Sequence, residues 1–305
     1  MKADAARDDG WRVHLTLVGV QTGFALFPIF GKLALRSIPP MALAAIRVVS
    51  AALILAAFHR TRPGGERIAR ADRGRLLLLA VLGVSANQIL FLFGLAFTSA
   101  INTGVLIALI PIDTLAVAVL LGQERLNGRA ALSIVLGLSG ALGIVGAERF
   151  AWHDRSFRGN LLLVASGISY SFYLVLSRPV LARYRAATVI SAVFLFGAIP
   201  IVLAAVPVLR RFEPSSVPLS DWASLAAIVV FCTALPYAWN SWALARTEAS
   251  RVAFYVFLQP VIASLLAVAV LGERLTVRRA VAATLILSGL AVCLARPRAP
   301  AAART

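Results

Sequence analysis

An arginine in the middle of an apolar stretch is the first residue whose chemistry needs an explanation. Arg47 lies within the run MALAAIRVVSAALILAAF, far from either end of a helix predicted over residues 39–58. A charge at that depth in a hydrocarbon layer is costly and faces a bundle interior or a water-filled cavity. Because a guanidinium binds carboxylates bidentately, we predict that Arg47 anchors an anionic group of a small molecule. Structural pairing with a carboxylate or with backbone carbonyls is the equal alternative.

Asp113 is the only acidic residue deep within an apolar run, two positions after Pro111. A carboxyl group at such a depth is rare and often belongs to a proton relay. We therefore name Asp113 as a candidate for proton coupling. Two alternatives stay open, an ion pair with Arg47 and a position at a cavity edge without a role.

Several amides and two prolines also interrupt the apolar runs. The amides are Gln21, Asn87, Gln88, Asn240 and Gln259. Such groups commonly join helices by hydrogen bonds of roughly 0.6 kcal/mol, and amides that converge on one interface could also contact a solute. Pro111 and Pro260 each remove a helix hydrogen bond, so they could bend or gate the helix or turn freed carbonyls toward a ligand.

Aromatic residues gather in the second half of the chain, and Tyr173, Tyr237 and Trp239 are candidates for contact with a solute. Tyr237 and Trp239 lie nearer the middle of their apolar run than residues of an interfacial aromatic belt would. A cavity lined by aromatic rings favours amphipathic or aromatic solutes, including cations.

Groups that could catalyse a reaction or hold a metal are scattered. His14, His59 and His153 lie near the ends of apolar runs, and Cys232 and Cys293 have no CxxC pattern and no neighbouring histidine. A lipid-acting membrane enzyme would need a convergent acid, base, nucleophile or metal set. We predict no catalytic residue, no metal site, no cofactor and no enzymatic activity.

Composition shows which elements must position these side chains. Of 305 residues, 60% are hydrophobic and only 14% are charged, whereas soluble proteins are typically about 25% charged. The formal charge of +17 comes almost entirely from arginines that lie between apolar runs. That placement is typical of membrane topology and argues against nucleic-acid binding. The sequence therefore predicts an all-α polytopic protein embedded in a lipid bilayer.

Ten apolar runs are long enough to cross a hydrocarbon core of about 30 Å as helices. They cover residues 14–35, 39–58, 75–97, 100–121, 129–147, 159–178, 188–209, 221–243, 251–271 and 277–295. With the N-terminus inside, nineteen Lys and Arg residues lie on the inner side and ten on the outer side. This bias predicts a multi-pass plasma (inner) membrane protein with both termini in the cytoplasm. The last outer loop, with three arginines, disagrees locally.

The chain matches itself at a shift of 149 residues. Pro111 falls on Pro260, Glu124-Arg125-Leu126 on Glu273-Arg274-Leu275, and Ser139-Gly140 on Ser288-Gly289. Each copy contains five predicted helices, an odd number, so the two copies cross the membrane in opposite senses. Inverted repeats of this kind are typical of secondary transporters, whose site lies at the repeat interface.

The two segments Pro-x12-Glu-Arg-Leu followed by Ser-Gly, with LLGQERL, VLGERL and LAFTSA, resemble the ten-helix drug/metabolite transporter superfamily. The resemblance implies two EamA-type repeats and a secondary carrier that uses neither ATP nor a bound cofactor. It also implies that the chain divides into a first repeat, a linker, a second repeat and a cytoplasmic tail. These parts cover residues 1–147, 148–158, 159–295 and 296–305.

Together these observations predict a transporter that works by alternating access and exports a small metabolite, such as an amino acid or a related compound. A multidrug or cation efflux carrier is the alternative within transport. The expected partners are a small-molecule solute, the bilayer and a coupled proton. A homodimer is open as well, although packing within the chain explains Gly19-x-x-x-Gly23 before dimerisation does.

Overall fold

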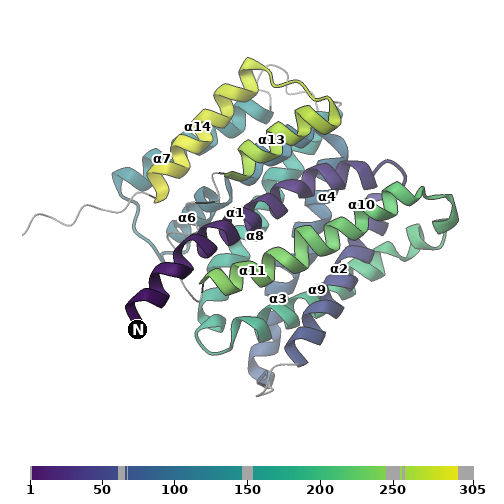
Figure 1. Ribbon diagram of the computed structural model, residues 1–305, viewed down its shortest axis with the longest axis horizontal. Coiled ribbons are helices and arrows are strands. Elements are labelled where there is room, and N and C mark those ends of the chain that lie inside the picture. The colour runs from purple at the N-terminus through teal and green to yellow at the C-terminus, as the bar shows by residue number, and fades with distance from the viewer. Residues whose placement is uncertain are drawn as a thin grey trace, which may run out of the picture.

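A computed structural model of the protein describes residues 2–60, 66, 68–145, 154–244, 255 and 258–294. All regular elements in these ranges are helices (Figure 1). They are, in chain order, α1 Lys2–Ala34, α2 Pro40–Arg60, η1 Arg70–Asp72, α3 Arg73–Ala80, η2 Val81–Ala86, α4 Asn87–Phe97, α5 Ala100–Ile107, α6 Ile110–Leu120, α7 Gly128–Val145, α8 Arg155–Leu181, α9 Ala186–Leu209, η3 Pro214–Ser216, α10 Leu219–Val229, η4 Val230–Ala234, α11 Leu235–Leu244, α13 Leu258–Leu271 and α14 Val277–Leu294.

The apolar composition explains why helices dominate. In lipid, only a helix or a closed barrel satisfies every backbone N–H and C=O group internally. Among the described residues, five helical segments are long and apolar enough to cross a membrane, and a sixth counts if α5 and α6 form one bent span. Shorter apolar helices cover Gly128–Ile144, Leu219–Ala234 and Leu258–Leu271. The start of the predicted helix 251–271 lies largely outside the described residues.

The predicted helix 100–121 differs from the structure, which has two helices there. α5 ends at Ile107, α6 begins at Ile110, and their axes differ by 42°. Pro111 is the second residue of α6. Its ring cannot accommodate the carbonyl of residue 107 in a continuous helix, which accounts for the break just before it. Pro260 is the third residue of α13 and is buried.

Two π-helical segments occur at equivalent places of the two repeats. η2 begins at Val81 and η4 begins at Val230, which is the same separation of 149 residues that relates the repeats. In η2, the Ser85 hydroxyl donates to the Gly197 carbonyl at 2.9 Å. In η4, the Thr233 hydroxyl donates to the Ile228 carbonyl at 3.0 Å. Side-chain hydroxyl groups thus satisfy backbone carbonyls near both irregular turns.

The connections after α6 and α13 are also alike. Gly122 and Gly272 adopt φ values of 69° and 65°, a left-handed conformation that glycine adopts without strain. This conformation is a common way to end a helix, and in each repeat the Glu-Arg-Leu triplet follows shortly after it. The structure therefore repeats the turn as well as the sequence motif.

Helix packing follows the same relation of 149 residues between the repeats. Equivalent helices pair across the repeats, as the contacts α2–α9 and α7–α14 show, and α5 of the first repeat packs on α13 of the second. The contact α4–α8 has its counterpart in α1–α11, α3–α8 in α1–α10, and α6–α8 in α1–α13. The protein is all-helical with two repeats, and its largest buried core joins helices of both.

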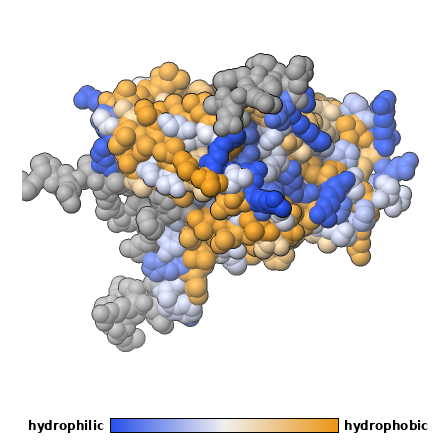
Figure 2. Space-filling view, turned by 90° about the horizontal axis from the view of Figure 1, so that it is seen from above, coloured by the Kyte–Doolittle hydropathy of each residue, from blue (hydrophilic) through white to orange (hydrophobic). Residues whose placement is uncertain are grey.

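The outside of the bundle carries many large apolar side chains. Leu53, Leu120, Leu203 and Leu265 are each more than 60% exposed. Figure 2 shows broad apolar areas on one face, interrupted by groups of hydrophilic residues. A surface of this kind fits contact with lipid chains rather than with water.

Candidate functional site

Arg47 is held inside the bundle by an aromatic ring and an amide. Its side chain is 6% exposed on α2, and Nη1 donates to Oε1 of Gln88 on α4. Its Cζ lies 4.2 Å from the centroid of the Phe27 ring on α1. A guanidinium over a ring face is attracted by the ring quadrupole, more strongly where water is excluded. Three helices of the first repeat therefore converge on this charge.

The ring beneath Arg47 is itself fixed. Phe27 stacks on Phe91 of α4 with centroids 4.9 Å apart and planes 20° from parallel. Both rings belong to the buried core. The guanidinium thus has a rigid apolar platform on one side, which keeps it in place at small conformational cost.

From Gln88 a chain of hydrogen bonds runs into the second repeat. Gln88 Nε2 donates to Asn87 Oδ1 at 3.0 Å. Asn87 Nδ2 donates to the carbonyl and to Oγ of Ser166 on α8, at 3.0 and 2.9 Å. The predicted residues Arg47, Gln88 and Asn87 are therefore brought together, and Ser166 joins them to α8.

The other predicted amide pair forms a separate link. Gln259 Nε2 on α13 donates to Gln21 Oε1 on α1 at 2.5 Å, and Gln21 is buried. This bond also crosses between the repeats. The predicted Asn240 is half-buried on α11.

Asp113 lies on α6, whereas Arg47 lies on α2. Its Oδ2 is buried and has no hydrogen-bond partner among the described residues. A Cβ at Gly167 would lie 3.1 Å from that oxygen, so the carboxyl group faces α8 at Gly167. The alternative of an ion pair between Asp113 and Arg47 is not present among the side chains that the structure describes.

Two of the predicted aromatic residues, Tyr173 and Trp239, pack against glycines of neighbouring helical segments. The Tyr173 ring lies against Gly83 of η2, where a Cβ would come within 2.6 Å of the ring. The centroids of the Tyr173 and Tyr170 rings are 5.4 Å apart. Trp239 is 38% exposed and packs on Gly19 of α1. The side chain of Tyr237 lies outside the described part of the structure. Of the two predicted aromatics whose side chains the structure describes, Tyr173 packs on a π-helical segment, next to the hydrogen-bonded series Gln88–Asn87–Ser166.

Ser166 and its neighbour Ser169 were not predicted from the sequence. Ser169 Oγ donates to the Leu82 carbonyl of η2 at 2.8 Å. Together with Tyr170 and Tyr173, the two serines follow a spacing of i, i+3, i+4 and i+7, which places them on one helix face. That polar and aromatic stripe in an apolar run was the available signal.

Two buried aspartates were missed as well, although the repeat relates them. Asp72 and Asp221 are separated by 149 residues and begin equivalent helices. Asp72 accepts from Arg183 Nη1 at 3.1 Å and from the Tyr184 hydroxyl at 2.7 Å. Asp221 accepts from the Ser37 hydroxyl at 2.5 Å. Each carboxylate ties the start of one helix to a loop of the other repeat.

Glu273 makes a further contact between the repeats. Its Oε1 accepts from the Ala100 N–H at 2.7 Å and its Oε2 from the Ile101 N–H at 3.0 Å. A carboxylate there satisfies unpaired amides and the positive end of the helix dipole of α5. Glu124, at the equivalent place of the first repeat, is exposed.

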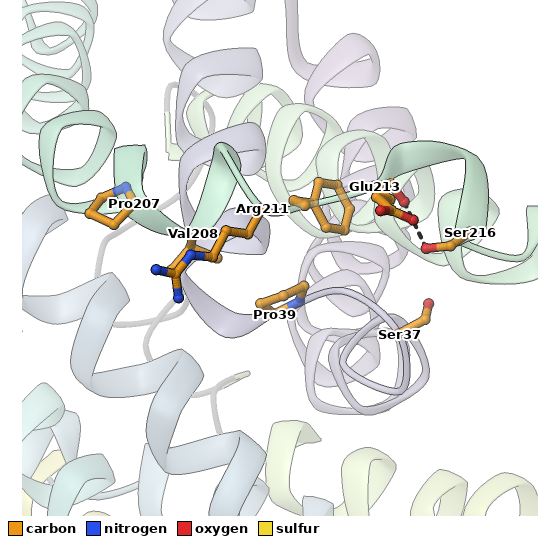
Figure 3. A pocket seen from close by; sticks show the side chains of 8 residues that line it. Ser37, Pro39, Pro207, Val208, Arg211, Glu213 and Ser216 are labelled. Atoms are coloured by element: carbon orange, nitrogen blue, oxygen red, sulfur yellow. Dashed lines mark hydrogen bonds between the residues drawn. The ribbon is translucent and has the colours of Figure 1, made fainter.

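A hollow of about 450 Å³ lies elsewhere, at an end of the bundle (Figure 3). It is lined by residues of both repeats, from Ser37 and Pro39 to the end of α9 and the segment after it. The figure shows the Arg211 guanidinium and the Glu213 side chain on opposite sides. None of the predicted site residues lines it.

Comparison with known proteins connects this architecture to transport. Residues 11–146 and 157–295 each match the EamA-like transporter family. An uncharacterized transporter of Archaeoglobus fulgidus is 25% identical over 264 residues, which cover 85% of this chain and 90% of that protein. The uncharacterized transporter YyaM of Bacillus subtilis is 22% identical, with 91% of this chain and 93% of that protein covered.

One relative is named for its solute. The probable terminal-alkyne amino-acid exporter of Streptantibioticus cattleyicolor is 25% identical over 264 residues, covering 86% of this chain and 85% of that protein. A solved crystal structure with 20% identity has the same fold, with a TM-score of 0.63 over 92% of this chain and 96% of that chain. The two matched regions span most of the sequence, so this multi-pass integral membrane protein is a transporter, not an enzyme, and belongs to the EamA-like transporter family.

Proposed function

We propose that this transporter exports a small metabolite that carries a carboxylate group, an amino acid or a related compound, and that Arg47 anchors that group. The buried guanidinium of Arg47 is the observation that carries the proposal. Two of its neighbours, the Gln88 amide and the Phe27 ring, carry no charge, and the fork geometry of a guanidinium suits a planar carboxylate. The relative named as an amino-acid exporter supports the same solute class.

The two repeats supply the mechanism. Equivalent helices such as α2 and α9 pair between the repeats, and five membrane-crossing segments per repeat would make the copies inverted. Exchange of conformation between the copies would open the interface first to one side and then to the other. The bonds Gln259–Gln21 and Asn87–Ser166 cross that interface and would have to adjust in each cycle.

Asp113 is the proposed proton carrier. Its buried Oδ2 has no donor among the described residues, and it faces α8 of the other repeat. A carboxyl group in this position could release a proton when a change of conformation brings water to it. The excess of Lys and Arg on one side favours both termini in the cytoplasm and the protein in the plasma (inner) membrane.

Efflux of aromatic or cationic drugs is the second candidate. It is favoured by the adjacent Tyr170 and Tyr173 rings, since ring faces bind aromatic solutes and cations. In that case Asp113 rather than Arg47 would supply the charge that selects the solute.

The test is export of a pooled, isotopically labelled metabolite panel from cells that express the wild-type protein or Arg47→Ala. We expect loss of export of one carboxylate class by about tenfold or more, because charged hydrogen bonds contribute roughly 1.5–3 kcal/mol. Arg125→Ala removes an exposed arginine and is the matched control. All variants are compared at equal abundance in the membrane. Unchanged carboxylate export in Arg47→Ala, with loss of a cationic dye in Asp113→Asn, would favour drug efflux instead.

A further inference from the structure

The amide groups of Gln88 and Asn87 beside Arg47 are held in one orientation, and Ser166 of the second repeat determines it. Both hydrogen bonds donated by Asn87 Nδ2 go to Ser166, one to its carbonyl and one to its hydroxyl oxygen. The NH2 group of the Asn87 amide therefore points toward α8. Its oxygen must face the opposite way, where it accepts from Gln88 Nε2 at 3.0 Å.

The next amide is fixed in the same manner. Because Gln88 Nε2 donates to Asn87, the oxygen of the Gln88 amide is the end that meets Arg47. A carbonyl oxygen satisfies one N–H of the guanidinium without cancelling its positive charge. A carboxylate at the same place would form a bidentate ion pair and neutralise the site.

Ser166 is well placed to hold this orientation. It is buried, and its hydroxyl also donates to the Asn87 backbone carbonyl at 3.1 Å. One turn further along α8, Ser169 holds the Leu82 carbonyl. The two serines therefore fix both the side chain and the backbone at the junction of η2 and α4.

We propose that Gln88 is a specificity-determining residue of this transporter and that Ser166 is its positioning residue. A neutral acceptor in a fixed orientation adds no negative charge beside Arg47, whereas a carboxylate at the same position would compete with the carboxylate of a solute. Asn87 and Gln88 were both candidates for solute contact from their sequence, but their hydrogen bonds give them different tasks. This inference rests on the proposed function, because it requires that Arg47 meets the solute.

The experiment uses the full-length protein in proteoliposomes and measures the KM for labelled L-phenylalanine and L-leucine. Phenethylamine and isoamylamine, which lack the carboxylate, serve as comparison probes. Gln88→Glu should raise the KM for both amino acids by about tenfold or more, since the new carboxylate occupies Arg47. The maximal rate at saturating amino acid should change far less. Gln123→Glu adds the same charge in an exposed loop and is the matched control.

Variants of Ser166 test its positioning role separately. Ser166→Ala should raise the KM for the amino acids by a smaller factor, about threefold, because the amides lose their fixed orientation. Ser166→Thr keeps the hydroxyl and should restore the wild-type KM. A merely structural serine would lower the amount of folded protein or the maximal rate without this split between KM and rate.

The outcomes separate the inference from the proposed function. If Arg47→Ala abolishes amino-acid transport while Gln88→Glu leaves the KM unchanged, the inference is wrong and the anion anchor stands. If Arg47→Ala leaves the KM unchanged, or if the wild-type protein transports neither these amino acids nor any carboxylate of a wider pool, the proposed function is wrong and the inference falls with it. If the amines respond to Gln88→Glu as the amino acids do, carboxylate selection by Gln88 is overturned.

Discussion

The two repeats agree where helices begin, turn and end, and they differ where the candidate site lies. Asp72 and Asp221 begin equivalent helices, and the π-helical segments η2 and η4 begin 149 residues apart. At the same shift Arg47 is replaced by Phe196. The duplicated architecture is therefore retained while the chemistry of the interior has diverged.

The divergence follows a pattern of polar against apolar groups. The residues of the first repeat Asn87, Gln88 and Asp113 correspond to Pro236, Tyr237 and Ile262 in the second. The reverse holds elsewhere, since Asn240 and Gln259 of the second repeat correspond to Phe91 and Ile110. A site between the repeats therefore combines hydrogen-bonding groups with rings and apolar groups, which suits a solute with a polar head and an apolar body.

The largest effect is expected at a position without a counterpart. Asp113→Asn should lower the rate of export driven by a proton gradient by about tenfold or more, because an amide cannot bind and release the proton. Export down a solute gradient should persist. The measurement is accumulation in proteoliposomes with and without an imposed pH difference. Asp154→Asn, at an exposed aspartate, is the control. If export driven by the pH difference persists in Asp113→Asn, Asp113 is not the proton carrier.

An intermediate effect is expected at the paired aspartates. Asp72→Ala and Asp221→Ala should each lower the free energy of unfolding by about 2 kcal/mol, within the range for hydrogen bonds to charged groups. Asp72 accepts from the Tyr184 hydroxyl, and Asp221 accepts from the hydroxyls of Ser37 and Ser220. The ion pair of Asp72 adds little, since the Arg183 side chain is 63% exposed. Thermal unfolding of the purified variants measures both values, and a much larger loss in one variant would show that the two contacts are not equivalent.

The smallest effect is expected at the paired glutamates. Glu273→Gln weakens a contact with two backbone amides and should cost about 1 kcal/mol, comparable to loss of a helix cap. The Glu124 side chain is exposed, where solvent weakens an interaction of its charge, so Glu124→Gln should cost less. The same unfolding assay compares them, and a larger loss at Glu124 than at Glu273 would contradict the expected order.

Much of the fold followed from the sequence because hydrocarbon imposes a simple rule. Apolar runs bounded by arginines and prolines had to form helices, and matching Glu-Arg-Leu triplets revealed the two repeats. The break between α5 and α6 was harder to place, since a proline inside an apolar run predicts an irregularity without fixing its angle. The π-helical segments were not predicted, because Val, Leu, Gly and Ala form either kind of turn.

The site was only partly predictable, for a physical reason. Depth in an apolar run identified Arg47, Gln88 and Asn87, because polar groups there are rare and costly. Which of them meet depends on helix rotation and on packing between distant segments, which composition does not encode. Ser166 was missed because a single serine is common in membrane helices, and only its spacing with Ser169, Tyr170 and Tyr173 distinguished it.

The extra residue in η2 has a consequence for how this site could change. Each residue advances an α-helix by about 100°, so a turn that contains one residue more rotates everything after it by that angle. Asn87 and Gln88 begin the helix that follows η2, and their direction is therefore set by the number of residues before them. Deleting one residue between Val81 and Ala86 would keep both amide side chains and point the pair at a different neighbour. The phase of the helix, counted in residues, is thus a determinant of solute recognition that no single substitution would reveal.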